Sequence, residues 1–443
     1  MTATVDAAYW NARLAELTVE FEVPGASLAF LHEGEVHSFA AGVLNKDTGT
    51  PVSTDSLFQI GSVSKVWTAT QLMLLVEQGR LTLDTPVVDL LPEFKVADAE
   101  VTKTVTVRHL LTHTSGIDGD LFLDTGRGDD CLEKYLTACA DLTQNHPIGE
   151  SFSYCNSGFV IAGRIIERLT GKSWDEALRE QICEPLGLTH TWTLPEDVLR
   201  FSAATGHVED GKPTPVWGLP RAMGPAGLIC ARASDVVAFG RAHLGTDLLA
   251  APEAMVVSQV RLPNPYTLAP EWGIGWILDE WSGHRVIMHA GNTIGQAAML
   301  WVIPDTGTVV CLLANGGETA ALQRALGREL FAALADVEMP ELLGPPETPV
   351  DVDVARYVGT YERVGCLATV TVEEDGRFHL HVEVTGELAD ISPAMDWDLI
   401  SVDETTFVGR REGSPLWDSM VFYELADGSS YLHMGVRATP KTA

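Results

Sequence analysis

Apolar residues recur with a helical period over residues 5–20, which predicts an amphipathic helix at the start of the chain. Short alternating runs such as Ala26–Leu31 follow, and the turn at residues 33–35 makes a hairpin the natural interpretation. The segment from Lys65 to about Glu77 is apolar on nearly every face, and Gly79 follows as a stop signal. A helix that is apolar all round is buried, so we expect this one at the centre of its domain.

Further helices and strands can be predicted in the middle of the chain. The helices are expected at 157–170 and 234–244, each followed by a glycine, and apolar strands at 285–289, 297–303 and 308–314. Together with the early hairpin, these strands lie at both ends of the first part of the chain, with helices between them. This order predicts an α+β domain whose sheet combines strands from those two ends.

The character of the chain changes after a proline-rich segment. Residues 340–350 contain four prolines, which predicts a semi-rigid linker. Beyond it, short β-prone runs flank Asp-Gly turns at 375–376 and 427–428. We therefore expect a first domain over 1–339 and a small all-β domain, a sandwich or barrel, over 351–443.

The composition is that of a globular protein with a strong acidic surplus. The chain has 443 residues, of which 46% are hydrophobic, and a net charge of -32. This charge disfavours nucleic acid and anionic membranes as partners, because both require positive potential. No stretch reaches the roughly 20 apolar residues that span a bilayer, and we identify no secretory signal, so we expect a cytoplasmic protein. The seven cysteines form no CxxC pair, and neither a disulfide framework nor a metal site is indicated.

The only S-x-x-K segment of the chain, Ser62 to Lys65, precedes the buried helix. If that helix begins at Ser62, Lys65 lies one turn further on the same face, where its amine reaches the Ser62 hydroxyl. Burial lowers the pKa of a lysine and makes Lys65 a candidate base. An S-x-x-K occurs about once by chance in a chain of this size, so the position before a buried helix is what makes Ser62 a candidate nucleophile.

A second candidate element is Tyr154-Cys155-Asn156, in a loop just before a predicted helix. The other Y-x-N of the chain, at 9–11, lies inside the first amphipathic helix. A tyrosine in the loop can pass protons between Ser62, Lys65 and a leaving group. Asn156 can donate a hydrogen bond to a substrate carbonyl.

The third element is His289-Ala290-Gly291, which ends an apolar strand. Three other H-x-G triplets lie in a hairpin turn, at a helix end and in the predicted β domain, at His32, His243 and His433. A strand edge beside the nucleophile can bind substrate by main-chain pairing. Asn292, which follows, can supply an oxyanion donor through its backbone N–H.

Two loops are candidate walls of a substrate pocket. They are residues 118–130, which are acidic, and residues 213–221, which contain Trp217. Trp217 can stack on a substrate, and the alternative for both loops is an ordinary surface role. An acidic wall favours a cationic or amine-bearing substrate.

Taken in order, these elements resemble the serine β-lactamase and penicillin-binding-protein superfamily, and most closely its class C β-lactamase-like branch of esterases, D-aminopeptidases and transacylases. The segments LFQIGSVSK, LLTHTSGI, FSYCNSGFVIAGRIIERLTGKSW, EPLGL and GPAGLICARASDVVAF are similar to family segments, and the likeness spans about residues 10–335. It implies an antiparallel sheet flanked by helices and an all-helical subdomain. Residues 350–443 are similar to the lipocalin-like barrel appended to some family peptidases.

The resemblance also implies roles for these residues. Ser62 would be the nucleophile, Lys65 and Tyr154 the acid/base pair, and the N–H groups of Ser62 and Asn292 the oxyanion hole. Asn156, His289 and Gly291 would contact the substrate. Which of Lys65 and Tyr154 takes the serine proton stays open, and no cofactor is implied.

One departure from the family pattern narrows the substrate. β-Lactamases of this branch carry Lys-Thr-Gly where this chain has His289-Ala290-Gly291. A largely neutral histidine and an alanine hold a substrate carboxylate less well, which disfavours β-lactamase and carboxypeptidase activity. We expect a small-molecule ester or amide substrate, with water as acyl acceptor in a hydrolase or an amine or alcohol in a transacylase, as in antibiotic biosynthesis. A D-amino-acid peptidase is the alternative.

Three other classes compete with this interpretation. His109 and His113 have the spacing of a zinc pair, but Leu110 stands where a metalloprotease has its glutamate. An α/β-hydrolase would need a G-x-S-x-G segment, which is absent from the sequence. A catalytically silent binding relative is disfavoured because every reacting group is present.

Overall fold

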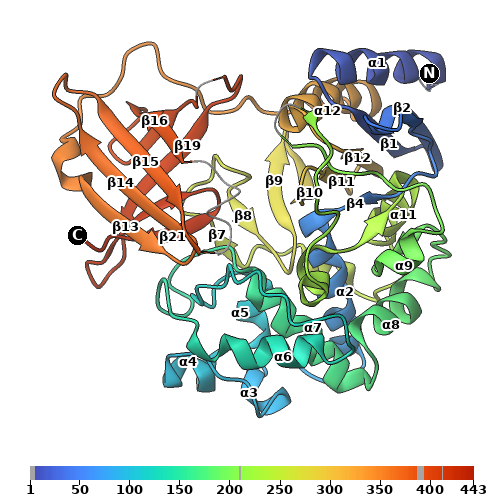
Figure 1. Cartoon of the computed structure of the whole chain (residues 1–443), viewed down its shortest axis with the longest axis horizontal. Coiled ribbons are helices and arrows are strands. Elements are labelled where there is room, and N and C mark those ends of the chain that lie inside the picture. Colours follow the sequence, from blue (N-terminus) through green and yellow to red (C-terminus); the bar gives the residue numbers. More distant parts are fainter. Residues whose placement is uncertain (1–4, 209–210, 387–393, 412) are drawn as a thin grey trace.

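The computed structural model describes residues 5–208, 211–386, 394–411 and 413–443. Its largest element is an antiparallel nine-stranded sheet with the strand order β3-β2-β1-β12-β11-β10-β9-β8-β7 (Figure 1). The strands are β1 Gly25–His32, β2 Glu35–Asn45, β3 Thr50–Pro51, β7 Val260–Arg261, β8 Glu271–Trp272, β9 Ile277–Trp281, β10 His284–Asn292, β11 Ala297–Ile303 and β12 Thr308–Ala314. β1 pairs with both β2 and β12, so the early hairpin and the late strands complete one sheet, as the sequence predicts.

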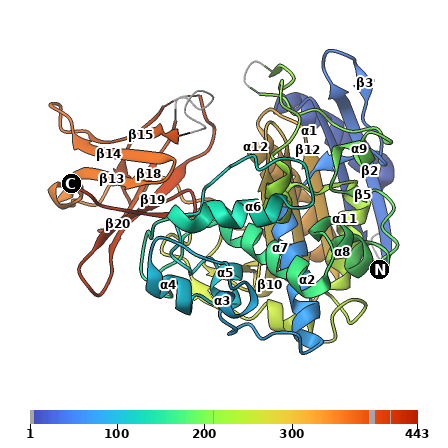
Figure 2. The ribbon, with the colours of Figure 1, turned by 60° about the horizontal axis from the view of Figure 1, so that its bottom comes forward.

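The central strands are buried on both faces. Along β12, Val309 and Cys311 join one apolar cluster, whereas Val310 and Leu312 join the other. This alternation follows from the two-residue period of a strand. The helices α1 Ala7–Glu20 and α12 Thr319–Ala335 cover one face, and α11 Ala233–Ala242 covers the other (Figures 1 and 2). The predicted α+β class is confirmed.

The helix α2, Ser64–Glu77, lies buried among the sheet, α11 and the helical region of the chain. Its Trp67 stacks on Phe239 of α11 with ring centroids 3.9 Å apart. The helical region lies to one side of the sheet (Figure 1). Its helices include α3 Val87–Leu90, α4 Ala99–Thr104, α5 Val107–Leu111, α6 Cys131–Ala138, α7 Asn156–Thr170, α8 Trp174–Leu178, α9 Pro195–Val198 and α10 Gly224–Gly227. In the described part of the chain, no helix is both long enough and apolar enough to cross a membrane.

Two small antiparallel sheets follow residue 350. The first runs β13 Gly359–Arg363, β14 Cys366–Val372, β15 Phe378–Val384 and β16 Met395–Asp398, and the second β17 Ile400–Ser401, β18 Thr406–Gly409, β19 Asp418–Glu424, β20 Ser430–Met434 and β21 Arg437–Pro440. They share one apolar core. Their edges meet at the isolated bridge between Tyr361 and Lys441 and at backbone hydrogen bonds of Thr360 with Thr442 and Ala443. Among the described residues, β13 and β21 therefore meet only at this end, and the expected barrel consists of two separate facing sheets.

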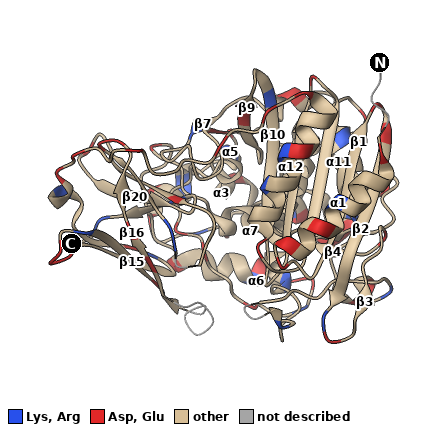
Figure 3. Cartoon of the chain, turned by 90° about the horizontal axis from the view of Figure 1, so that it is seen from above, with Lys and Arg blue, Asp and Glu red and all other residues tan. Residues whose placement is uncertain are grey.

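The C-terminal sheets pack directly against the first part of the chain. The Asn264 amide donates to the Ser419 carbonyl at 2.9 Å, and the hydroxyls of Ser151 and Tyr423 are 2.7 Å apart. Asp and Glu residues are spread over both parts, which places the acidic surplus on no single face (Figure 3). The segment 340–350 contains no helix or strand and connects the two parts.

Truncating Phe331 tests the packing of α12 on the sheet. Its ring is fully buried, 5.3 Å from that of Trp281 and 5.7 Å from that of Trp301. We expect Phe331→Ala to lower the free energy of unfolding by about 3–5 kcal/mol, because the cavity cannot collapse fully. Leu199→Ala, at a side chain that is 82% exposed, should change it by less than about 0.5 kcal/mol. Equal urea midpoints for the two variants would contradict this packing.

Candidate active site

Ser62 lies in a tight turn that joins a short strand to α2. The strand β4 Phe58–Gln59 pairs with β6 Cys230–Ala231 and leads into the 3₁₀ turn η1, Gly61–Val63. The α-helix therefore begins at Ser64 and not at Ser62. Residues three apart eclipse each other in a 3₁₀ turn, so Lys65 still lies over Ser62.

Lys65 is fully buried and points at the Ser62 hydroxyl. Its Nζ lies 3.0 Å from Ser62 Oγ and 2.7 Å from the carbonyl oxygen of Ala226. Burial, and then the positive charge of Arg437, hold the pKa of Lys65 well below its usual range. Among the described residues, no carboxylate lies within ion-pair distance of its Nζ. Burial and the charge of Arg437 both favour the neutral form of the amine.

Tyr154 lies beside both Lys65 and Ser62. The Lys65 Nζ lies 4.8 Å from the centre of its ring, and the ring stacks on His113 at 4.2 Å. Burial raises the pKa of Tyr154, although a hydrogen bond with Ser62 and the charge of Arg437 oppose the rise. The phenol therefore stays protonated near neutral pH.

Two glycines let the Ser62 turn press against β10. A Cβ on Gly61, whose φ is +52°, would lie 2.6 Å from the Asn292 nitrogen. A Cβ on Gly291 would lie 2.0 Å from the Ile60 carbonyl oxygen and 2.9 Å from the Ser62 nitrogen. Only glycine allows this approach. It brings the backbone N–H groups of Ser62 and Asn292, the two oxyanion donors expected from the sequence, to the same place.

The edge of β10 is open beside Ser62. β9 pairs with β10 only as far as Met288, so residues 289–292 extend past its end. The Thr293 N–H donates to the Gln296 carbonyl at 2.9 Å and closes the β10–β11 hairpin. Because pairing alternates along a strand, the backbone groups of Asn292 point away from β11, toward this open edge.

His289 is buried and neutral. Its Nδ1 donates to the Ala290 carbonyl at 2.6 Å, and its ring meets Trp272 edge to face at 5.5 Å. Burial, and then Lys65, lower the pKa of His289 to about 3. Its Nε2 has no hydrogen-bond partner among the described residues. The ring supplies a hydrogen-bonding group to the site without a charge.

The C-terminal sheets supply a cation that the sequence did not reveal. Arg437, at the start of β21, binds the buried carboxylate of Asp120, with its Nη2 3.0 Å from Oδ1. Its guanidinium also lies 5.3 Å from the centre of the Tyr154 ring. The preceding residue, Val436, has a left-handed φ of +63° and accepts a hydrogen bond from the Tyr154 N–H at 3.0 Å. A turn of the second part of the chain thus enters the site.

Asp120 is the centre of this connection. Its carboxylate also accepts hydrogen bonds from the Asn156 amide at 2.8 Å and from Arg363 at 3.1 Å. Burial alone would raise its pKa, but Arg437 and Arg363 outweigh burial and hold the pKa of Asp120 below its usual value. Asp120 thereby fixes Asn156 at the wall of the pocket. The sequence indicates Asp120 only as one residue of an acidic loop.

These groups line a cavity of about 300 Å³. Both predicted wall loops contribute, through Phe122 and Leu219. Trp217 does not line it, which corrects the expectation from the sequence. Its indole N–H donates to the Ala204 carbonyl at 3.0 Å, and its ring packs on a separate apolar cluster with Leu57. The sequence motif nearest Arg437 is the H-x-G triplet that begins at His433. From the sequence alone, this triplet belongs to the predicted β domain and not to the active site.

No metal site takes part in this arrangement. Within the ranges that the structure describes, three His, Cys, Asp or Glu side chains nowhere converge as a metal ion would require. His109 bonds within its own helix start, to Thr106, and His113 Nδ1 accepts the Cys155 N–H at 2.9 Å.

Substituting Asp120 tests the connection between the two parts of the chain. We expect Asp120→Asn to lower the free energy of unfolding by about 3–5 kcal/mol, because it leaves buried guanidinium groups without their partner. The matched control is Asp124→Asn, at an exposed residue of the same loop. The urea midpoint measures the effect, and equal midpoints would contradict the network described above.

The chain is similar to a known protein family and to several of its members. The beta-lactamase family profile matches residues 10–335. Penicillin-binding protein 4 of Amycolatopsis lactamdurans is 48% identical over 375 residues, which cover 81% of this chain and 98% of that protein. Esterase EstB of Burkholderia gladioli is 28% identical over 70% of this chain and 92% of its own length.

A solved structure extends the likeness to the C-terminal sheets. The crystal structure of SurE superposes with a TM-score of 0.80 and 28% identity, covering 98% of this chain and 99% of that one. A second SurE structure, with D-Leu, has a TM-score of 0.77 and 29% identity over the same shares. Taken with the profile match, these relatives establish that the chain belongs to the beta-lactamase family.

Proposed function

We propose that this protein is an acyl-transfer enzyme in which Ser62 attacks an ester or amide and carries the acyl group as a covalent ester. The observation that carries the proposal is the position of the buried Lys65 Nζ 3.0 Å from Ser62 Oγ. A neutral amine at hydrogen-bond distance can take the proton of a serine hydroxyl as it attacks. A catalytically silent relative would have no need to keep an unpaired lysine buried.

The two titratable groups beside Ser62 have different protonation states, and we assign them different roles. Lys65, whose pKa is depressed, is the base in acylation. Tyr154, whose pKa is raised, holds a proton that it can deliver to the leaving group. Pairs of groups with pKa values pushed apart are typical of acid–base sites. Lys65 and Tyr154 both hydrogen-bond to Ser62, so the proton can return through them for deacylation.

The substrate carbonyl is proposed to bind between the backbone N–H groups of Ser62 and Asn292. Each such donor typically contributes about 2.7–4 kcal/mol to the stabilisation of an oxyanion. The open edge of β10 can pair with the backbone of the donor, in the manner of an added strand. Asn156, held by Asp120, faces the same cavity and can orient the acyl group.

The donor is proposed to be an ester or amide whose reacting residue has the D configuration. SurE, which is similar over nearly the whole chain, has been solved with D-Leu. The neutral His289 gives no ion pair to a free carboxylate, and Arg437, a cation in the lining of the same cavity, is already paired with Asp120. Both features favour a donor without a free carboxylate over a β-lactam or a D-amino-acid peptide terminus. Water or an amine then accepts the acyl group.

Removing the nucleophile tests this proposal. We expect Ser62→Ala to abolish turnover of the p-nitrophenyl ester of N-acetyl-D-leucine, and covalent labelling by a fluorophosphonate, because no other group can form the ester. Intact-mass measurement and circular dichroism check the labelling and the fold. A Ser62→Ala protein that still becomes labelled would overturn the assignment, and Ser64→Ala serves as the neighbouring control.

The charge of Arg437 should set the acidic limb of the pH–rate profile. Lys65 works as a base only when neutral, so the rate falls as the pH drops below its pKa. Arg437 lowers that pKa, and its removal raises it. We therefore expect Arg437→Met to move the acidic limb to higher pH by about one unit.

The control for this prediction is Arg377→Met, at an exposed arginine of the C-terminal sheets that pairs with Asp375 and Asp398. Its pH profile should match that of the unaltered protein. An acidic limb that stays in place, or moves to lower pH, in Arg437→Met would contradict the electrostatic role assigned to Arg437.

A further inference from the structure

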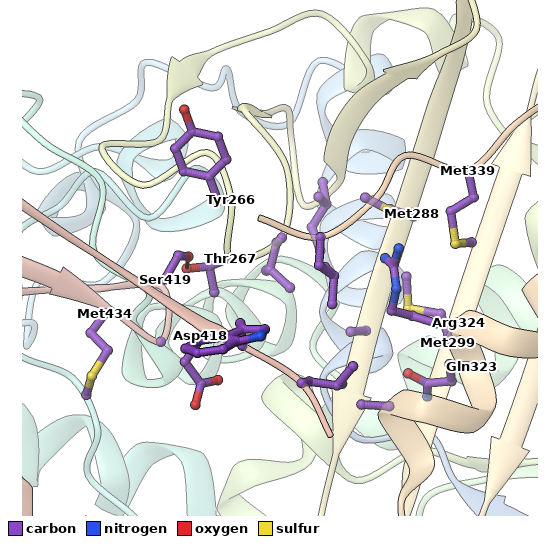
Figure 4. A pocket seen from close by; sticks show the side chains of 18 of the residues that line it. Tyr266, Thr267, Met288, Met299, Gln323, Arg324, Met339, Asp418, Ser419 and Met434 are labelled. Carbon is purple, nitrogen blue, oxygen red and sulfur yellow. Dashed lines mark hydrogen bonds between the residues drawn. The ribbon is translucent and has the colours of Figure 1, made fainter. Parts of the chain in front are cut away.

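A second cavity, here named the interdomain chamber, lies between the catalytic sheet and the C-terminal sheets (Figure 4). Its volume is about 440 Å³. Met288, Met299 and Trp301 line it from the catalytic sheet, and Trp397, Trp417 and Met434 line it from the other side. Methionine side chains adapt to apolar ligands of different shapes, and indole rings offer large contact areas.

The charged groups at the chamber wall already have partners. Asp418 accepts hydrogen bonds from the Trp397 indole at 2.9 Å and from Arg411 at 3.3 Å. Arg324 donates to the Pro340 carbonyl at 2.7 Å. The chamber therefore offers mainly apolar surface, and each of its charged side chains already has a hydrogen-bond partner, which fits an uncharged, apolar group.

The chamber adjoins the cavity that holds Ser62 at the free edge of β10. Leu268, Ile277 and Ala290 line both cavities. The turn that carries Arg437 separates them on the other side, since Gly435 lines the chamber and Val436 lines the Ser62 cavity. A group that enters the chamber can thus belong to a molecule whose reacting atom is at Ser62.

A third cavity, of about 760 Å³, leaves the Ser62 cavity in the other direction along β10. It is lined by residues 292–295 and shares Phe122, Leu219 and Asn292 with the Ser62 cavity. The chamber, in contrast, is lined by Met288 and Ala290 of the same strand. Two separate cavities therefore adjoin the Ser62 cavity, at different positions along β10.

The direction of main-chain pairing indicates which cavity lies on the side of the donor chain and which on the side of the leaving group. A donor residue that bonds Asn292 through both its C=O and its N–H forms an antiparallel pair. The donor chain that precedes this residue then runs beside residues 293–295. The leaving group, and the acceptor that replaces it, lie toward Ala290 and the chamber.

We propose that the interdomain chamber is the acceptor subsite of a transacylase and binds the apolar substituent of an amine. This inference rests on the proposed acyl-Ser62 intermediate and names its acceptor class. The amine nitrogen bonds to the acyl carbon, and the bond from that carbon to Ser62 Oγ breaks. One amine proton passes to neutral Lys65, and a proton returns to Ser62 Oγ, so the enzyme is regenerated and an amide leaves.

The test measures how the acyl-enzyme partitions between an amine and water. The full-length protein is acylated with the p-nitrophenyl ester of N-acetyl-D-leucine in the presence of phenylalaninamide or glycinamide, and the ratio of amide to acid is measured. We expect the apolar amine to be preferred at least about tenfold. Trp417→Ala should reduce that preference about tenfold, because it removes much of the apolar contact.

The matched control is Trp192→Ala, at a partly buried tryptophan near Arg200 that lies outside these cavities. Equal use of both amines, or an unchanged preference in Trp417→Ala, would overturn the chamber assignment.

A binding measurement separates this inference from the proposed function. Calorimetric titration of the Ser62→Ala protein with phenylalaninamide should detect binding that Trp417→Ala weakens about tenfold, without any acyl chemistry. If the unaltered protein released no p-nitrophenol, the acyl-transfer function would fall, and this titration would still decide whether the chamber binds an apolar amine. If the Ser62→Ala protein bound phenylalaninamide equally well with and without Trp417→Ala, the chamber would be rejected as the binding site.

Discussion

The site depends on one costly arrangement, the burial of Lys65 beside Ser62 with no carboxylate of the described residues paired to it. Burial disfavours the ammonium form, so the pKa of Lys65 is held well below its usual range. The rest of the fold maintains that burial. α2 is enclosed by the sheet and by helices on its other sides, and the Ala226 carbonyl accepts a hydrogen bond that holds Nζ 3.0 Å from Ser62 Oγ. The reactive geometry therefore follows from the position of one helix.

The C-terminal sheets contribute to the chemistry of this site as well as to its walls. Arg437 adds a positive charge beside Lys65 and Tyr154, and Asp120 neutralises enough of it for the guanidinium to be buried. A buried ion pair of this kind contributes little net stability, so we interpret it as a device that fixes position. The same carboxylate orients Asn156, and the two parts of the chain consequently form one active site.

Much of the fold could be predicted from periodicity, because its strands and α2 are buried on all sides and carry strong signals. The strands at 297–303 and 308–314 have the bounds that the sequence predicts. Ser62, Lys65 and Tyr154 were found because they lie in short motifs next to such elements. Arg437 cannot be found in this way, since it lies 317 positions after Asp120 in the sequence. The sequence does not fix the place of Trp217, because a loop tryptophan fits a pocket wall and a small core equally well.

The most direct test of this account is the pKa of Lys65, measured by NMR titration of protein with ¹³C-labelled lysine and assigned with Lys65→Met. The account predicts a resonance that titrates well below the usual lysine value of about 10.4, so that the amine is a base in the working range of the enzyme. A Lys65 that titrates at or above that value would be protonated beside Ser62, and the proposed mechanism would be wrong.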